Sequence, residues 1–517
     1  MKAQILFKTT RSLVLELLDE KADYFTEEYV ITIDGREYSS NKAIFSIADL
    51  KPDTEYGIEI KRGEEVFTMT AKTDYEFVTL NVKDFGAAGD GVNDDTPFIQ
   101  AAILTAPKNG RVYVPAGVYC ITHLFLKSDM VLEVGKDATI LGVPDKKRIP
   151  ILPGRIESYD ETGEYLPASW EGNPLDCYAS IITGMNCENV VICGEGTIDG
   201  GADFDNWWNT EKRRNDPGAR PRMMFLNNCS NVIVQGVTIK NSPSWNMHPY
   251  FSKNIRFIDI TLQSPSNSHN TDGIDPESCT GVEIVGVHFS VGDDCIAIKS
   301  GKIYMGKTYK TPSKDITVRN CFMEKGHGAV TIGSEIGAGV ENIVVKNCYF
   351  LETDRGLRVK TRRGRGKDSF LNGITFENVR MKSVRSAFVI NGFYYCGADG
   401  KSEYVATKEA LPVDDRTPRV GAIKIKNVEC RDTHVAGVYF YGIPESKIQC
   451  VELENVYIDF AEDARPGKAA MMNGCEAGRK QGVFIRNADK VTLKNVVIEG
   501  YEGEPTNIEE VGEWSWN

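Results

Sequence analysis

The sequence lacks any hydrophobic run long enough to cross a membrane. No stretch approaches the roughly 18 unbroken apolar residues that a membrane-spanning helix requires. At the amino end, Lys8 and then Arg11 interrupt the chain before a secretory-type apolar core can form. We therefore expect a protein with no membrane partner that works in the cytoplasm, or is secreted or periplasmic only if a leader has been removed.

Regularly paired cysteines are also missing. The thirteen cysteines form an odd, scattered set, and no two of them make a Cys-x-x-Cys pair. This argues against structural zinc or an iron–sulfur cluster, and it favours a reducing compartment over a disulfide framework. Cys187, Cys229 and Cys279 each stand three residues before an apolar strand start. Their spacing predicts small buried side chains at equivalent places in a repeat.

Positive charge is in deficit. The 60 basic residues are outnumbered by 73 acidic residues, and the net charge is −13. This balance argues against a nucleic-acid partner or an anionic membrane surface. It would also repel any acidic ligand, so such a ligand would have to be held by a local cluster of basic residues.

The chain of 517 residues is too long for one ordinary hydrophobic core, so more than one domain is expected. Residues 1–77 are predicted to form a small all-β module. Short alternating runs such as residues 29–33 and 56–60 are separated by turn signals such as Asp34-Gly35. Residues 50–56, Leu-Lys-Pro-Asp-Thr-Glu-Tyr, resemble the turn before a late strand in fibronectin type III domains. That resemblance implies that the Tyr56 hydroxyl pins a sandwich corner by bonding to the backbone, and that the module is accessory.

From residue 78 to 517 the sequence has few helical patterns. One exception follows Asp94-Asp95-Thr96, where Pro97 and then Phe98, Ile99, Ala102 and Ile103 have helical spacing. This helix could cap the open end of a solenoid.

A repeat of the form apolar-x-apolar-x-Asn dominates the carboxy-terminal half. It begins at residues 316, 343, 374, 423, 451 and 491, at intervals of 27, 31, 49, 28 and 40 residues. Short strands with variable loops between them predict stacked coils, with the asparagines in one turn bonding to those above and below. The strand density fits a right-handed parallel β-helix better than a propeller or a leucine-rich array. The predicted class is all-β.

Four short motifs fall into register with these coils. They are Asn270-Thr271-Asp272-Gly273-Ile274-Asp275, Gly292-Asp293-Asp294-Cys295, Gly326-His327-Gly328 and Arg358-Val359-Lys360. Asp272 to Asp294, Asp294 to His327 and His327 to Arg358 are 22, 33 and 31 residues apart, about one coil each. Each motif alone is usually a solvated turn or an exposed face. Their joint placement predicts one acidic pocket flanked by cations.

The chemistry that such a pocket supports is acid–base catalysis. Crowding three carboxyl groups disfavours ionising all of them, so one is held protonated beside ionised neighbours. A protonated carboxyl and an ionised carboxylate are what cleavage of a glycosidic bond needs. Arg358 and Lys360 project to the same side of a strand and could grip a uronate carboxylate, and Arg362, Arg363 and Arg365 add charge beside them.

These motifs, in this order, resemble the signature of the polygalacturonase family, glycoside hydrolase family 28. The resemblance runs from about Val82 to the end of the chain. Residues 82–91 with 94–96 are similar to the start of pectin-degrading β-helix proteins in general. Gly196-Thr197-Ile198-Asp199-Gly200 and Ser242-Pro243-Ser244-Trp245 with His248-Pro249 match the hydrolases more narrowly.

The resemblance implies a mechanism without a metal or other cofactor. It makes Asp293 the general acid and assigns Asp272 and Asp294 to activate the water that inverts the anomeric centre. His327 is expected to assist the acid and to hold the site together. The expected substrate-binding residues are Arg358, Lys360, His248 and Asn270. For His248, contact with sugar and burial at a coil corner are equally open. For Asp275 we favour a turn residue.

The expected partner is a pectic oligosaccharide or polygalacturonate, cleaved at α-1,4-galacturonosidic bonds. Long insertions and the amino-terminal module can close one end of a groove, which favours an exo-acting enzyme that trims imported oligomers. A lyase on the same fold and a non-catalytic glycan-binding solenoid are the alternatives. The sequence leaves open the oligomeric state, the exact pectic substrate and the role of the first module.

Overall fold

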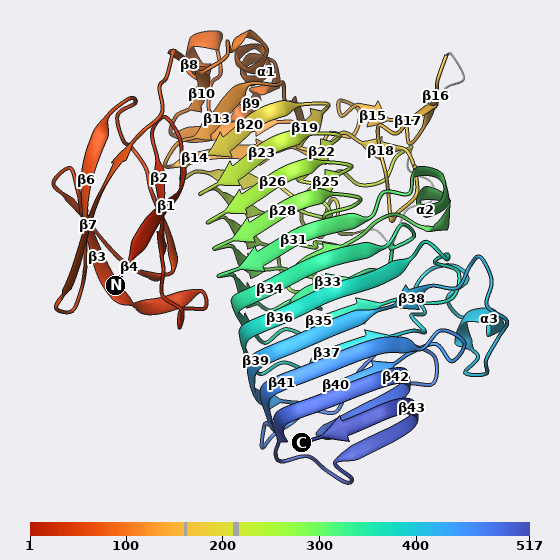
Figure 1. Cartoon of the computed structure of the whole chain (residues 1–517). Coiled ribbons are helices and arrows are strands. Elements are labelled where there is room, and N and C mark those ends of the chain that lie inside the picture. Colours follow the sequence, from red (N-terminus) through yellow and green to blue (C-terminus); the bar gives the residue numbers. More distant parts are fainter. Residues whose placement is uncertain (160–162, 210–216) are drawn as a thin grey trace.

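A long parallel β-helix with a small β-sandwich on its side makes up the molecule (Figure 1). The computed structural model describes residues 1–159, 163–209 and 217–517. The coils wind into a right-handed helix, as expected. Among the described helices, none is long and apolar enough to cross a bilayer.

The amino-terminal module consists of two antiparallel sheets. One holds β1 (Ala3–Lys8), β2 (Leu13–Leu17) and β5 (Ile44–Ile47), and the other holds β4 (Arg36–Lys42), β3 (Phe25–Ile33), β6 (Glu55–Arg62) and β7 (Glu65–Lys72). The expected tyrosine bond is present, because the Lys51 amide donates to the Tyr56 hydroxyl over 2.7 Å. The type III assignment itself, with the division into 1–77 and 78–517, is a proposal, supported by the pairing of residues 78–81 with the helix.

Three parallel sheets form the helix. The first contains β8 (Val78–Asn81), β10 (Gly110–Val114), β13 (Met130–Val134), β20 (Glu188–Cys193), β23 (Ser230–Gln235), β26 (Lys253–Ile258), β28 (Thr280–Val285), β31 (Ser313–Arg319), β34 (Val340–Leu351), β36 (Phe370–Lys382), β39 (Ala422–Thr433), β41 (Ile448–Phe460), β42 (Gln481–Ile498) and β43 (Thr506–Trp516). The second contains β9 (Asp90–Asp94), β11 (Gly117–Ile121), β14 (Ala138–Gly142), β21 (Thr197–Asp199), β24 (Thr238–Lys240), β27 (Thr261–Gln263), β29 (His288–Ser290), β32 (Phe322–Glu324) and the later halves of the long strands.

The third sheet carries the residues of interest. Its strands are β12 (Leu124–Phe125), β19 (Ile182–Met185), β22 (Met224–Asn227), β25 (Met247–Tyr250), β30 (Ile296–Ile298), β33 (Val330–Ile332), β35 (Arg355–Lys360), β37 (Ser386–Asn391) and β40 (Ala436–Tyr441). Ile274 bridges β25 and β30. Inward side chains of all three sheets merge into one hydrophobic core from residue 82 to 498.

The smaller elements lie in turns and insertions. They are η1 (Val82–Phe85), α1 (Thr96–Thr105), α2 (Ile303–Tyr309), α3 (Glu403–Ala406), the short strands β15 (Ile151–Leu152), β16 (Ile156–Glu157), β17 (Glu164–Tyr165) and β18 (Cys177–Tyr178), and β38 (Arg419–Val420). The predicted capping helix is α1, which buries Ile99, Ala102 and Ile103 against the first coils while Phe98 stays partly exposed.

The predicted asparagine ladder is present in the turns from Asn347 to Asn495, whereas Asn320 of the first repeat bonds instead to the Asp23 carbonyl of the amino-terminal module. Asn378 Nδ2 donates to Asn347 Oδ1 over 3.3 Å, and the same bond recurs from Asn427, Asn455 and Asn495, each to the asparagine one coil before, over 3.1, 2.9 and 2.9 Å. Each of these residues has a φ between 51 and 54°, a left-handed conformation that asparagine tolerates. Equivalent positions of the repeat pair directly, for example Ile343 with Ile374.

The sandwich packs on the helix at the turns that follow β23, β26, β28 and β31. Val14 and Ile44 bury an apolar contact with Ile258 and Val285. Polar contacts surround it, including Lys42 to Asp259 at 2.9 Å and an ion pair of Arg319 with Glu16. These turns are on the far side of each coil from the third sheet.

Candidate active site

The adjacent aspartates lie in the turn that leads into β30. The Asp294 amide donates to Asp293 Oδ1 over 3.0 Å, and the His327 amide donates to the Asp293 carbonyl over 2.9 Å. A Cβ on Gly328 would lie 2.8 Å from Asp294 Oδ1 and 2.3 Å from Thr331 Oγ1. The Gly-His-Gly motif is therefore needed because the next coil must close directly over the Asp294 carboxylate.

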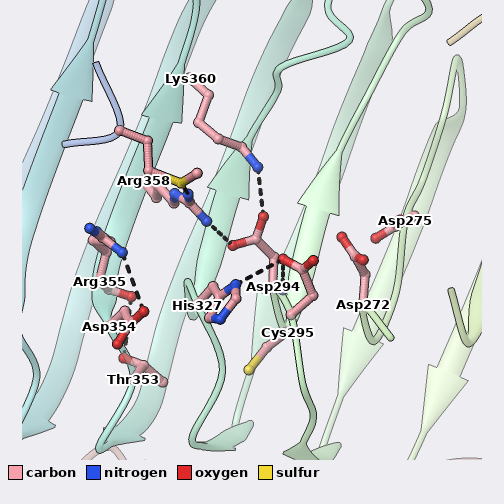
Figure 2. Close-up of polar contacts among 12 residues, drawn as sticks. Asp272, Asp275, Asp294, Cys295, His327, Thr353, Asp354, Arg355, Arg358 and Lys360 are labelled. Atoms are coloured by element: carbon pink, nitrogen blue, oxygen red, sulfur yellow. Dashed lines mark hydrogen bonds and ion pairs between the residues drawn. The ribbon is translucent and has the colours of Figure 1, made fainter. Parts of the chain in front are cut away.

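Asp294 is held between two cations. Arg358 Nη1 donates to one carboxylate oxygen and Lys360 Nζ to the other, both over 2.7 Å (Figure 2). The two cations alternate with Val359 on β35, so they face the pocket while Val359 enters the core. Burial raises the pKa of Asp294, but Arg358 and Lys360 together lower it by more than burial raises it. The net pKa is therefore far below its usual value. Asp294 is thus a permanently ionised carboxylate.

Asp293 and His327 form a more exposed pair. His327 Nδ1 lies 3.3 Å from Asp293 Oδ1, and the imidazole is half exposed. The hydrogen bond to Asp293 raises the pKa of His327. Burial raises the pKa of Asp293, but the bond from His327 together with the charges of His327 and Lys360 lowers it by more, so the net pKa is lowered. The two shifts favour an ionised Asp293 beside a protonated His327.

Asp272 completes the carboxylate group from the preceding coil. One oxygen of each of Asp272, Asp293 and Asp294 lies within 4.8 Å of the others. Asp272 Oδ1 has no hydrogen-bond partner. Burial, followed by the charges of Asp275 and Asp293, raises the pKa of Asp272 well above its usual value. The winding of the chain thus gathers the three carboxylates into one acidic pocket, as their spacing predicts, and Asp272 is the one of the three whose pKa is raised.

Lys299 is a residue that the motifs missed. Its Nζ lies 3.4 Å from Asp275, 3.8 Å from Glu335 and 3.9 Å from Asp272, and 4.6 Å from the centroid of the Trp245 ring. Lys299 is buried, and its positive charge offsets the negative charges of these three acids. A signal was present in the sequence, since Lys299 directly follows the apolar strand Ile296–Ile298.

Burial contradicts the expected sugar contact of His248 and adds to the interpretation of Asp275. His248 is completely buried, with Nε2 2.9 Å from Glu277 Oε2 and its ring against the edge of Trp245, so it supports the pocket without facing sugar. Asp275 directly follows the bridge residue Ile274, outside any strand, but its carboxylate is fully buried beside Lys299. Burial raises the pKa of Asp275 to about 7. Periodicity cannot distinguish these cases, because burial on this face depends on insertions from other coils.

The arginines after β35 divide between two places. Arg362 and Arg365 line the cavity, as expected for a basic cluster. Arg363 does not, because its guanidinium turns away to Glu445, with Nη2 2.7 Å from Oε2. Consecutive residues in a loop after a strand can point in different directions. The basic cluster expected from the sequence therefore contains one arginine too many, Arg363.

The cavity has a volume of about 510 Å³, within the range of small-ligand sites. Asp272, Asp293, His327, Arg358, Lys360 and Asn270 all line it. Asn270 Oδ1 already accepts a bond of 2.6 Å from Arg220, which fixes its amide at the rim.

The walls of the cavity come from insertions between coils. Residues 171 and 173, residues 302–304 at the start of α2, residues 396–399 and Met471 border it. None of residues 1–77 does. The expectation that the amino-terminal module closes the groove is therefore wrong, because the module packs on the opposite side of the coils.

A carboxyl with a raised pKa, two carboxyls with lowered pKa values and cations around them, on a parallel β-helix, suit a glycoside hydrolase. The family model of glycosyl hydrolases family 28 matches residues 167–473, more than half of the chain. The model for rhamnogalacturonase A/epimerase, pectate lyase-like proteins matches residues 79–136, where the general β-helix motif was noted. The chain belongs to glycosyl hydrolase family 28.

Individual relatives agree with this assignment. A probable polygalacturonase of Vitis vinifera is 31% identical over 414 residues, covering 77% of this chain and 78% of the relative. An exo-poly-alpha-D-galacturonosidase of Dickeya chrysanthemi is 27% identical over 429 residues, covering 74% and 68%. The fold matches the family 28 exopolygalacturonase of Yersinia enterocolitica with a TM-score of 0.74, at 21% identity, over 99% of this chain and 98% of that one.

Proposed function

We propose that the protein hydrolyses α-1,4-galacturonosidic bonds of pectic oligo- or polygalacturonate from a chain end. The observation that carries the proposal is the gathering of Asp272, Asp293 and Asp294 with two cations in one cavity. The names of the Vitis and Dickeya relatives support galacturonan as the substrate, and the Dickeya name supports exo action. Action on imported oligomers in the cytoplasm stays a prediction.

Asp293 is the general acid of this proposal. It is the most exposed of the three carboxyls, and His327 beside it can supply the proton that Asp293 gives to the leaving oxygen. Asp272 is the base, because its unpartnered Oδ1 can accept a hydrogen bond from water. Asp294 steadies that water while anchored by Arg358 and Lys360.

The proposed roles require a proton to move when substrate binds. The pKa of Asp272 is raised, mainly by burial, and that of Asp293 is lowered by His327 and Lys360. Substrate that covers Asp293 strips it of water and favours its protonated form. The charge of Asp293 is one of the causes that raise the pKa of Asp272, so protonation of Asp293 lowers the pKa of Asp272 and favours the ionised base.

The lyase alternative fits the site less well. A calcium-dependent lyase needs several free oxygen ligands, since Ca²⁺ takes six to eight. Both oxygens of Asp294 are already bonded to cations of the protein. A glycan-binding solenoid would have no need of a carboxyl that keeps its proton. New reducing ends without new ultraviolet absorbance from a double bond separate the hydrolase from the lyase.

A product profile tests the direction of attack. The cavity is bordered by insertions on several sides, which supports entry of a chain end over binding of the middle of a polymer. We expect polygalacturonate digestion to release one short product from the first minutes, with a slow fall in viscosity. Measurement is by chromatography of early time points. A ladder of mid-sized oligomers with a rapid viscosity drop would contradict exo action.

The stereochemistry of the product is a second test. Family likeness implies inversion, whereas two carboxyl groups only about 5 Å apart are the general mark of retaining enzymes. The carboxylate oxygens here lie within 4.8 Å of one another. We nevertheless expect inversion, because no carboxylate is free to act as the nucleophile if Asp272 binds water and Asp294 is anchored. Proton NMR of the first-formed anomer distinguishes inversion from retention. A product of retained configuration would contradict the roles assigned to Asp272 and Asp294.

A further inference from the structure

A buried arginine in the cavity wall has no partner. Arg365 is 3% exposed, and no described residue accepts a hydrogen bond from its guanidinium or forms an ion pair with it. Other buried arginines nearby are satisfied, Arg358 by Asp294 and Arg363 by Glu445. An unpaired buried charge is costly, so a position that keeps one is a candidate for a ligand of opposite charge.

The charges of Glu335 and Asp399 act on Arg365 from a distance, but both acids are engaged with other cations. Arg362 adds a second cation, but its Nη2 is engaged with Asp399 over 2.7 Å. Glu335 is the acid with the largest electrostatic effect on Arg365. Its carboxylate also lies 3.8 Å from Lys299 Nζ. Burial and the charge of Arg362 lower the pKa of Arg365 to about 10, so the guanidinium is still charged at neutral pH.

Arg365 is separate from the cations beside the acidic group. Arg358 and Lys360 lie on β35 and are bonded to Asp294, whereas Arg365 lies beyond the end of that strand, near Glu335 and the start of α2. A substrate with one carboxylate per sugar presents charges in a row. One of these charges can meet Arg358 and Lys360, and another then needs a cation elsewhere in the cavity.

We infer that Arg365 is the specificity-determining anchor for a second substrate carboxylate, on a sugar unit next to the one whose carboxylate meets Arg358 and Lys360. This rests on the proposed function. A guanidinium binds a carboxylate through two parallel N–H bonds, a geometry that a neutral sugar cannot satisfy. The anchor therefore selects for uronates at two successive units and against esterified or neutral sugars at the second.

The test compares binding of digalacturonate and its methyl ester to inactive protein. In an Asp293→Asn background, calorimetry gives the preference for free acid over ester, with and without Arg365→Met. The substitution should reduce that preference by about 10- to 100-fold. In otherwise wild-type protein it should raise KM for short oligogalacturonates by a similar factor, with a much smaller change in kcat. Tm should not fall, because a buried charge without a partner is removed.

Lys367→Met is the matched control. Lys367 lies two residues further on, its exposed side chain pairs with Asp415 at 3.0 Å, and it does not line the cavity. It should keep the full preference for free acid. An equal loss of affinity for acid and ester in Arg365→Met, or no loss for either, would overturn the inference while leaving the hydrolase function intact. If wild-type protein neither binds nor cleaves galacturonates, the proposed function itself fails.

Discussion

Asp293→Asn is expected to lower kcat on oligogalacturonates by about 10²- to 10⁴-fold while substrate binding is retained. The amide preserves the shape of the side chain and can accept the Asp294 amide bond, but it has no proton to give to the leaving oxygen. Steady-state rates and calorimetry with the same oligomer measure the two effects. Unchanged turnover would contradict the role of Asp293, and retained binding without turnover in the variant alone excludes the binder alternative.

An activated leaving group sharpens this test. An aryl galacturonide with an acidic phenol departs without protonation, so Asp293→Asn should lose much less on it than on the natural link. Asp354→Asn is the control, because Asp354 carries charge near His327 but pairs with Arg355 and Arg385 outside the cavity. If Asp272→Asn shows the leaving-group dependence instead, the acid is Asp272, in line with its raised pKa in the empty pocket.

Asp272→Asn is expected to abolish most activity, by about 10²- to 10⁴-fold, equally on natural and activated substrates. Loss of the base affects the attack of water, which both substrates require. Asparagine can still hold a water molecule but cannot accept its proton. A loss that depends on the leaving group would reverse the assignment of the two aspartates.

The same variant should be at least as stable as the wild type at neutral pH. The pKa of Asp272 is raised in the folded state, chiefly by burial, so the folded protein binds this proton more tightly than the unfolded chain does. Its ionisation therefore costs stability as pH rises above the unfolded value of about 3.9. Thermal melts across pH should show the advantage of the variant growing above that value and vanishing below it. A lower Tm at neutral pH would show that Lys299 stabilises the ionised form.

Much of the fold could be predicted because it follows from local repetition. The asparagine at the end of each repeat adopts a left-handed turn whichever coil it occupies, and the alternating apolar residues before it must face the core. Coil-to-coil spacing then placed Asp272, Asp294, His327 and Arg358 on one face. These four are on or next to strands of one sheet, where register leaves little freedom.

Residues outside that register were not predictable. His248 lies on β25 in the same sheet, yet it is buried because Trp245 and other side chains cover it. Arg363 and Arg365 are two apart in a loop, yet one meets Glu445 and the other faces the cavity. Beyond the end of a strand, the spacing of two residues in the sequence no longer determines the direction in which their side chains point.

The sequence by itself determined the stacked coils, the family and the group of residues that carries the chemistry, because each depends on a period that strand pairing must preserve. Only the tertiary structure decided which charges are paired, which carboxyl keeps a proton and what encloses the cavity. Those properties depend on burial and on distances between insertions from separate coils, and electrostatic energies change steeply with both.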